Sequence, residues 1–189
     1  MAPLAAPVSS ESVWPTEDQP DVSPFDELLQ AVYRHDPSAI GRAIQRGTSV
    51  HDSDMDGRTA LIHAILDSEH DLGTIRCLLD LGSDVNHADA GQNWTSLAFA
   101  ARDQKPDVVR LLLDYGADVD PRDAFGNTPL WRAVFELRED TQVVNLLLTH
   151  GANPNAENTS GVSPLDLAET TGKTARIKWE RGISAARAT

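Results

Sequence analysis

The chain has 189 residues and a formal net charge of −13, from 29 acidic and 16 basic side chains. This length fits one domain with a tail, and such an acidic surface repels nucleic-acid phosphates and anionic membranes, so the expected partner is a basic protein. Cys77 is the single cysteine, which excludes an intramolecular disulfide and favours a reducing compartment, the cytoplasm.

Residues 1–23 are expected to form a flexible, proline-rich acidic tail. They contain four acidic side chains and no Lys or Arg, and they bury too little apolar surface to offset the entropy lost on ordering. They lack the pattern of a secretory signal, and no window of the chain approaches the roughly 20 apolar residues of a membrane span. Trp14 is the exception, because its indole either stays free or docks on the domain or on a partner.

The ordered domain is expected over residues 24–189. Ser23 is a suitable N-cap and Pro24 fits the first position of a helix, so a helix is predicted to begin here. A second helix is predicted from Pro37 to Gly47, where glycine provides the left-handed residue that ends many helices.

Two motifs then recur along the chain with the same spacing. A leucine-rich helix end followed by glycine repeats at intervals of 35, 34 and 35 residues, with the glycines at positions 47, 82, 116 and 151. A second motif, centred on a hydroxyl residue, repeats at intervals of 36, 33 and 35 residues, at Thr59, Thr95, Thr128 and Ser163. A fixed period in this range predicts a solenoid of stacked repeats.

These motifs resemble the ankyrin repeat, whose signature is Gly-x-Thr-Pro-Leu-His-x-Ala followed by a leucine-rich helix and Gly-Ala. Thr128-Pro129-Leu130 matches it letter for letter, and the resemblance extends from Phe25 to the C-terminus. It implies an all-α solenoid of helix–turn–helix units with short hairpin fingers. Five repeats are expected, the terminal ones acting as caps, at residues 24–53, 54–88, 89–122, 123–156 and 157–189.

Each motif residue has a physical role in such a fold. Hydroxyl groups are expected to cap the first helix of the later repeats, from Thr59, Thr95, Thr128 and Ser163. Leucines are expected to face the neighbouring repeat, at Leu61, Leu97, Leu130 and Leu165. Asn93 replaces the finger glycine of a longer third finger, and Asn tolerates the same left-handed backbone. The motif histidine is absent, its place being taken by Ile62, Ala98, Trp131 and Asp166.

No motif indicates catalysis, a metal ion or a cofactor. Residues 52–57 resemble the start of a calcium loop, but the twelfth position, which needs a bidentate acid, is His63. Residues 171–174 resemble the end of a phosphate-binding loop, but Leu167 stands where its first glycine is required. We therefore expect no enzymatic activity, no cofactor, no metal, and neither nucleic acid nor a membrane as partner.

The resemblance implies that a protein partner is bound through a concave face, which the finger tips and the first helices line. We expect this face to combine aromatic and charged side chains, at Met55, Asp56, Arg58, Asp67, Trp94, Arg102, Asp103, Phe125, Asn127, Trp131, Phe135 and Glu136. Trp94 and Phe125 are expected to be exposed at finger tips. Trp131 and Phe135 fit either this face or the packing between helices.

The expected function is that of a non-catalytic module, monomeric when free, that binds a basic protein. The acidic charge fits this role and equally fits a role in solubility. The alternative is a dedicated inhibitor or immunity protein that occludes the active site of a toxin or effector. Many toxins that act on nucleic acids or membranes are basic, and electrostatic attraction steers them rapidly onto an acidic protein.

Overall fold

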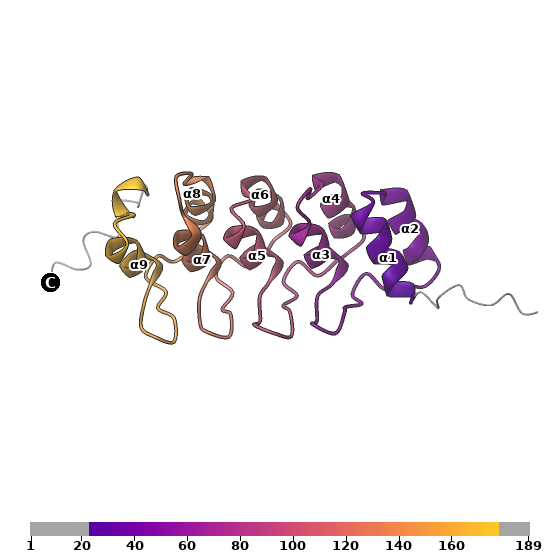
Figure 1. Cartoon of the computed structure of the whole chain (residues 1–189), viewed down its shortest axis with the longest axis horizontal. Helices are drawn as coiled ribbons and strands as arrows, with labels where there is room; N and C mark the ends of the chain where they lie inside the picture. The colour runs from indigo at the N-terminus through magenta and orange to yellow at the C-terminus, as the bar shows by residue number, and fades with distance from the viewer. Residues whose placement is uncertain (1–22, 178–189) are drawn as a thin grey trace, which may run out of the picture.

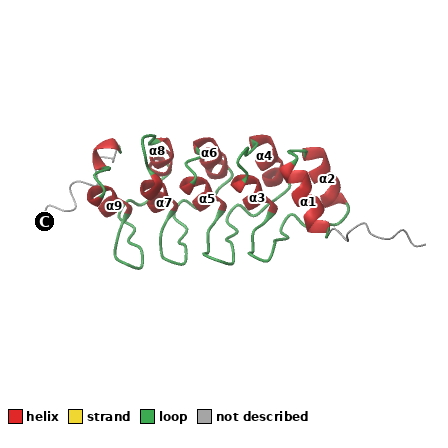
Figure 2. Cartoon of the chain, viewed as in Figure 1, coloured by secondary structure: helices red, strands yellow, loops and turns green. Residues whose placement is uncertain are grey.

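The computed structural model describes residues 23–177, which form a row of helix pairs with hairpin loops on one side (Figure 1). The first helices of the pairs are α1 (Pro24–Tyr33), α3 (Ala60–Leu66), α5 (Ser96–Arg102), α7 (Pro129–Glu136) and α9 (Pro164–Thr170). The second helices are α2 (Pro37–Gln45), α4 (Leu72–Asp80), α6 (Pro106–Asp114) and α8 (Gln142–Thr149), and a short 3₁₀ turn, η1 (Thr174–Arg176), follows α9. Within residues 23–177 the chain contains helices and loops but no extended strand (Figure 2).

Residues 1–22 and 178–189 lie outside the described part of the chain. The acidic tail expected at residues 1–23, and with it Trp14, falls there except for Ser23. So does the end of the fifth expected repeat. In the described range, no helix is both long enough and apolar enough to span a bilayer.

The helices pack in two rows. The inner row is α1, α3, α5, α7 and α9, in which each helix contacts the next, and α2, α4, α6 and α8 form the outer row in the same way. Leu61, Leu97 and Leu130 of the inner row are fully buried and Leu165 is nearly so, as leucines that face a neighbouring repeat would be. The core therefore runs along the whole stack, and no repeat has a core of its own.

Hydroxyl caps start four of the inner helices, and the one on α1 is the expected cap Ser23, whose hydroxyl accepts from the Asp26 amide over 3.1 Å. Thr95, Thr128 and Ser163 each accept a hydrogen bond from the backbone amide three residues later, at 3.4, 3.2 and 3.1 Å. The expected cap at Thr59 is wrong, because its hydroxyl makes no such bond to α3. Within the described residues the buried Thr59 hydroxyl has no hydrogen-bond partner, whereas α9 carries a complete capping box with Asp166.

Consecutive fingers are joined by backbone hydrogen bonds. The amide groups of Ala90, Ala124 and Thr159 donate to carbonyl groups in the preceding finger, over 2.8, 2.9 and 3.0 Å. Asn93 has a φ of 58°, so it adopts the left-handed conformation expected of the finger glycine that it replaces. The fingers thus form a connected series and are not independent loops.

Gly57 is required at its finger for two reasons. Its φ of 74° lies in the left-handed region, and a Cβ atom added there would lie 2.6 Å from the amide nitrogen of Ala90 in the next finger. Gly161, in the last finger, has a similar φ of 72°, but no atom lies within 4 Å of the corresponding position. Gly57 is thus required both for its left-handed backbone and for the close approach of the next finger, whereas Gly161 is required only for its left-handed backbone.

Histidine side chains join the first two repeats. A hydrogen bond of 2.9 Å connects His35 Nε2 to Asp67 Oδ2, and one of 2.8 Å connects the Tyr33 hydroxyl to His63 Nδ1. His63 Nε2 also lies 2.8 Å from Asp54 Oδ2, so this histidine links the second finger to α1. The hydrogen bond from His35 holds the pKa of the Asp67 carboxyl below its usual value.

Replacing Gly57 with alanine is expected to destabilise the protein by about 2–3 kcal/mol, because strain at positive φ adds to the clash with Ala90. Gly161→Ala is the matched control, and it should cost only about 1 kcal/mol, since strain alone remains. Urea unfolding of the two variants measures the difference. Equal losses of unfolding free energy would contradict the close approach between fingers.

Replacing Asp67 with asparagine is expected to lower stability at pH 7. The pKa of Asp67 is lower in the folded than in the unfolded state, so its contribution is present above the unfolded value of about 3.9 and is lost as the pH falls through the folded value. The variant should therefore unfold at a lower urea concentration than wild type at pH 7, and this difference in unfolding midpoint should become smaller as the pH drops below about 4. Asp114→Asn, on an exposed carboxyl of α6, should differ little from wild type at any pH.

Candidate binding surface

The finger tips and the inner helices α3, α5 and α7 form one face of the stack, called the inner face below. Four of the expected binding residues are exposed on it: Asp56, Met55 with 103% of its reference surface, and Phe125 and Phe135 with 53% each. Phe125 stands at the tip of the fourth finger, next to Gly126 with its φ of 76°. The expected exposure of Phe125 is therefore confirmed.

Trp131 and Phe135 form a stacked pair on α7. They are one helical turn apart, their ring centroids lie 5.3 Å from each other and their planes differ by 11°. Trp131 is half-buried, whereas Phe135 is exposed and does not fill the core between helices. The pair is an apolar surface that is held in one orientation by its own stacking.

The expected exposure of Trp94 is wrong, because only 7% of its surface is accessible. Its ring packs on Phe99, with centroids 5.1 Å apart. The guanidinium groups of Arg132 and Arg102 lie 4.3 and 5.2 Å from its ring centroid. Trp94 is thus held between two cations and an aromatic ring, inside the stem of the third finger.

The position of Trp94 in its finger explains this burial. It stands immediately before the capping residue Thr95, and its amide donates to Asp89 Oδ1 over 2.8 Å, which turns it back into the stem. In the fourth finger the same position holds Asn127, whose amide donates to Asp123 Oδ1 over 2.8 Å. Counting back from the capping threonine would have placed both residues in the stem.

Asn127 is likewise unavailable to a partner, which corrects its expected place on the binding face. Only 6% of its surface is accessible. Its side chain donates to Asp123 Oδ2 over 3.2 Å and accepts a hydrogen bond of 2.8 Å from Asn158. Asn127 therefore connects the fourth finger to the fifth.

Several charged residues of the expected set are engaged within the protein. Arg102 and Asp103 form a bidentate pair, with N–O distances of 2.5 and 3.0 Å. Asp56 lies 3.6 Å from the Arg58 guanidinium, and Asp67 is bonded to His35 as described above. Both members of the Arg102–Asp103 pair are partly exposed, so they can contact a partner only while keeping this bond.

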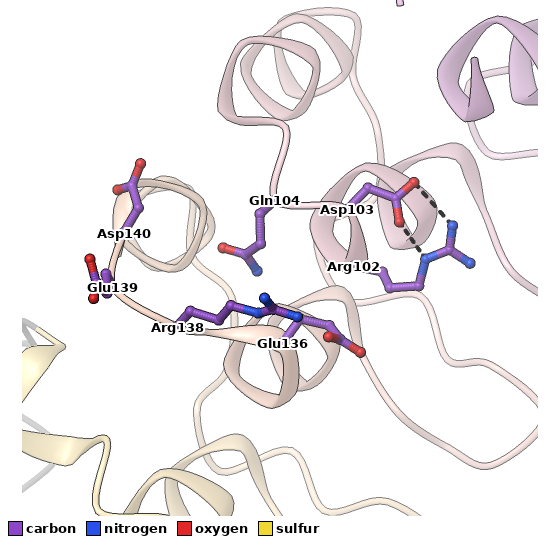
Figure 3. A pocket seen from close by; sticks show the side chains of 7 residues that line it. All are labelled: Arg102, Asp103, Gln104, Glu136, Arg138, Glu139 and Asp140. Carbon is purple, nitrogen blue, oxygen red and sulfur yellow. Dashed lines mark hydrogen bonds and ion pairs between the residues drawn. The ribbon is translucent and has the colours of Figure 1, made fainter. Parts of the chain in front are cut away.

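A hollow of about 330 Å³ lies where α5 and α7 end (Figure 3). Its lining combines two arginines with four acids and one amide, namely Arg102, Asp103, Gln104, Glu136, Arg138, Glu139 and Asp140. Gln104 holds the two helix ends together, because its side-chain amide donates to the carbonyl groups of Ala101 and Ala133 at 3.1 and 3.0 Å. In Figure 3 the Arg102–Asp103 pair lies on one side of the hollow, and Glu139 and Asp140 lie on the other.

Sequence reasoning missed Gln104, Arg138, Glu139 and Asp140. A signal was present, because five residues separate α7 from α8, whereas three separate α5 from α6. The longer connection places additional charged side chains at the edge of the inner face, beside Glu136. Comparing these turn lengths would have marked two candidates, because five residues also separate α3 from α4.

The calcium-like segment has a structural role in its finger. Asp54 Oδ1 accepts hydrogen bonds from the amides of Asp56 and Arg58, both at 2.9 Å, and its other carboxylate oxygen is bonded to His63. Across residues 23–177, no three His, Cys, Asp or Glu side chains are grouped so that they could hold a metal ion.

Burial and the nearby carboxylate of Asp80 raise the pKa of the Cys77 thiol, which favours its protonated and unreactive form.

Replacing Trp94 with alanine is expected to destabilise the protein by about 3 kcal/mol, because it leaves a cavity and separates two guanidinium groups from their aromatic contact. Phe125→Ala, which truncates an exposed ring, serves as the control and should change stability by less than about 0.5 kcal/mol. Thermal unfolding of both variants tests this assignment. A Trp94 variant as stable as wild type would mean that this ring is not part of the core.

Comparison with known proteins agrees with this architecture. The sequence profile described as ankyrin repeats (3 copies) matches residues 28–123 and again residues 69–158. No curated protein matches the chain. The two profile matches together extend over more than half of the chain, across the same helix pairs and fingers that form the inner face. The chain belongs to the ankyrin repeat family.

Proposed function

We propose that this protein binds a basic protein partner through the inner face and that it acts without catalysing a reaction. Ankyrin repeats mediate protein–protein interactions, which is the coarse function of the family. For this chain we propose, in addition, which face and which residues bind and that the partner is basic. It also takes the free protein to be a monomer in the cytoplasm, where a single cysteine stays reduced.

The observation that carries the proposal is the exposed aromatic surface of the fourth repeat. Phe135 lies stacked on Trp131, and Phe125 is exposed at the finger tip of the same repeat. Interfaces are enriched in such rings, because they bury a large apolar area at low entropic cost. In the described part of the chain, four of the five exposed large hydrophobic residues lie on α1, on fingers or on α7, namely Tyr33, Met55, Phe125 and Phe135.

The charge beside this surface favours a basic partner. Glu136 directly follows Phe135, and it lines the hollow together with Glu139 and Asp140. None of these three carboxylates forms an ion pair with a residue in the described range. A Lys or Arg side chain of a partner could enter the hollow, place its aliphatic part on Phe135 and bring its charge to these acids.

An inhibitor of a basic toxin or effector is the second candidate. The net charge of −13 supports it, because electrostatic steering accelerates the association of oppositely charged proteins. Both candidates use the inner face. They differ in what happens to the partner, since an inhibitor occludes the active site and an adaptor leaves it accessible.

Replacing both Phe125 and Phe135 with alanine is expected to weaken partner binding by about 2 kcal/mol or more, which is roughly 30-fold, while thermal stability stays unchanged. A pull-down from the native source identifies the partner, and titration of the purified partner measures the affinity. Leu81→Ala is the matched control, because Leu81 is an exposed apolar residue at the end of outer helix α4. This variant should bind like wild type.

Equal binding by the double variant and wild type would reject the inner face as the site. If binding is lost, an activity assay on the captured partner separates the two candidates. Loss of the partner's activity on addition of wild type, but not of the double variant, identifies an inhibitor. Unchanged activity identifies an adaptor.

A further inference from the structure

The first repeat presents an open groove at the end of the stack. Each repeat in the middle of the stack packs against a neighbour on both sides, whereas within residues 23–177 the main contacts of α1 and α2 with another repeat are those with α3 and α4. On their other side lies a hollow of about 340 Å³. Three alanines, Ala31, Ala39 and Ala43, line it together with longer polar side chains.

The polar residues of this groove are mainly cationic. Arg34, Arg42 and Arg46 line it, opposed by the single acid Glu27. Arg46 lies 3.4 Å from Glu27, and Arg42 lies 3.7 Å from Asp36 outside the groove. Arg34 forms no ion pair with any residue between 23 and 177. A basic groove in a chain of net charge −13 favours an acidic occupant.

Residues 1–22 have the complementary composition. They carry Glu11, Glu17, Asp18 and Asp21 but no Lys or Arg, so their side chains sum to −4. They also contain Trp14, a large side chain that could lie over Ala39, the half-buried alanine of the groove, and against a neighbouring guanidinium group, whereas Ala31 and Ala43 are already buried. This segment is joined directly to Ser23, the N-cap of α1, and is therefore present at the groove at high effective concentration.

The segment is long enough to reach along the whole groove. An extended chain spans at most about 3.6 Å per residue, so Asp18 and Asp21 can reach Arg46, whose partner Glu27 lies in the first turn of α1. Trp14 precedes Pro24 by ten residues and can reach about 35 Å, whereas the ten-residue α1 is only about 15 Å long. It can thus reach Arg34 at the far end of α1.

We propose that residues 11–22 bind in the groove of the first repeat, with their carboxylates on Arg34, Arg42 and Arg46 and with Trp14 over Ala39. The occupant is this segment of the same chain. It covers the end of the stack and stabilises the first repeat. Trp94 between Arg102 and Arg132 shows that the protein already uses contacts between an indole and guanidinium groups.

Amide hydrogen exchange of the full chain tests the proposal, because it reports the local stability of α1 and α2 separately from the rest. The test variant carries Glu17→Gln, Asp18→Asn and Asp21→Asn. The matched control removes the same charge at exposed positions elsewhere, with Asp114→Asn, Asp118→Asn and Glu157→Gln. We expect exchange in α1 and α2 to be about fivefold faster in the test variant and unchanged in the control, with α7 and α8 unaffected in both.

A second variant keeps residues 1–22 unchanged and reverses the charge of two groove residues, with Arg34→Glu and Arg42→Glu. It should accelerate exchange in α1 and α2 to a similar extent, and adding the three tail changes should cause no further acceleration, because the interaction is already lost. Additive effects would overturn the proposal. A test variant whose α1 and α2 exchange as slowly as in wild type would also overturn the proposal. If an added acidic peptide then slowed exchange in α1, the groove would be assigned to a partner instead.

Discussion

The fold depends on contact between neighbouring repeats. Each inner helix of a middle repeat is only seven or eight residues long, too short to be stable alone in water, and it becomes stable by burying its apolar side against the next repeat. Leu97 and Leu130 are fully buried, and so are the small residues Ala100 and Ala133, which let α5 and α7 approach closely. Stability is therefore distributed along the stack, and a change at one junction affects both of its repeats.

Contact between neighbouring repeats also holds the side chains of the proposed binding surface in place. Phe125 projects from a finger whose backbone is bonded to the next one, since its carbonyl group accepts hydrogen bonds from the amide and the hydroxyl of Thr159 at 3.0 and 2.9 Å. Phe135 is held by α7 and by its stacking on Trp131. A surface built in this way loses little conformational entropy when a partner binds. The junctions between repeats thus support both folding and recognition.

Most of the fold could be predicted from the sequence, because the repeat period and the cap residues are local signals. The buried leucines, the left-handed glycines and the left-handed Asn93 all agree with the structure. The site was less predictable. An exposed finger tip and a buried finger stem differ by two or three positions, and the extra residue of the third finger obscured this register at Trp94.

Long-range partners could not be read from the sequence either. Nothing local indicates that Arg132 would cover Trp94, 38 positions earlier in the chain, or that it would pair with Asp123 at 2.5 Å. The hollow at the ends of α5 and α7 has the same origin, because it joins turns of two repeats through Gln104. Such contacts depend on the stacking geometry, which the pattern of one repeat does not contain.

The distribution of charge follows from this geometry. The ammonium group of Lys105 donates to the carbonyl oxygens of Ile65 and Asp67 at 2.6 and 2.9 Å, at the end of α3. Lys173 does the same at the end of α7, with carbonyl groups at 2.9 and 2.7 Å. Cations near helix C-termini stabilise the helix dipole, so these lysines strengthen the junctions. Because such cations are bonded to backbone carbonyls between repeats, they leave carboxylates such as Glu136 unneutralised at the surface. The excess of acidic over basic side chains, 29 against 16, sets the net charge, and the contacts between repeats decide only which carboxylates have a cation beside them.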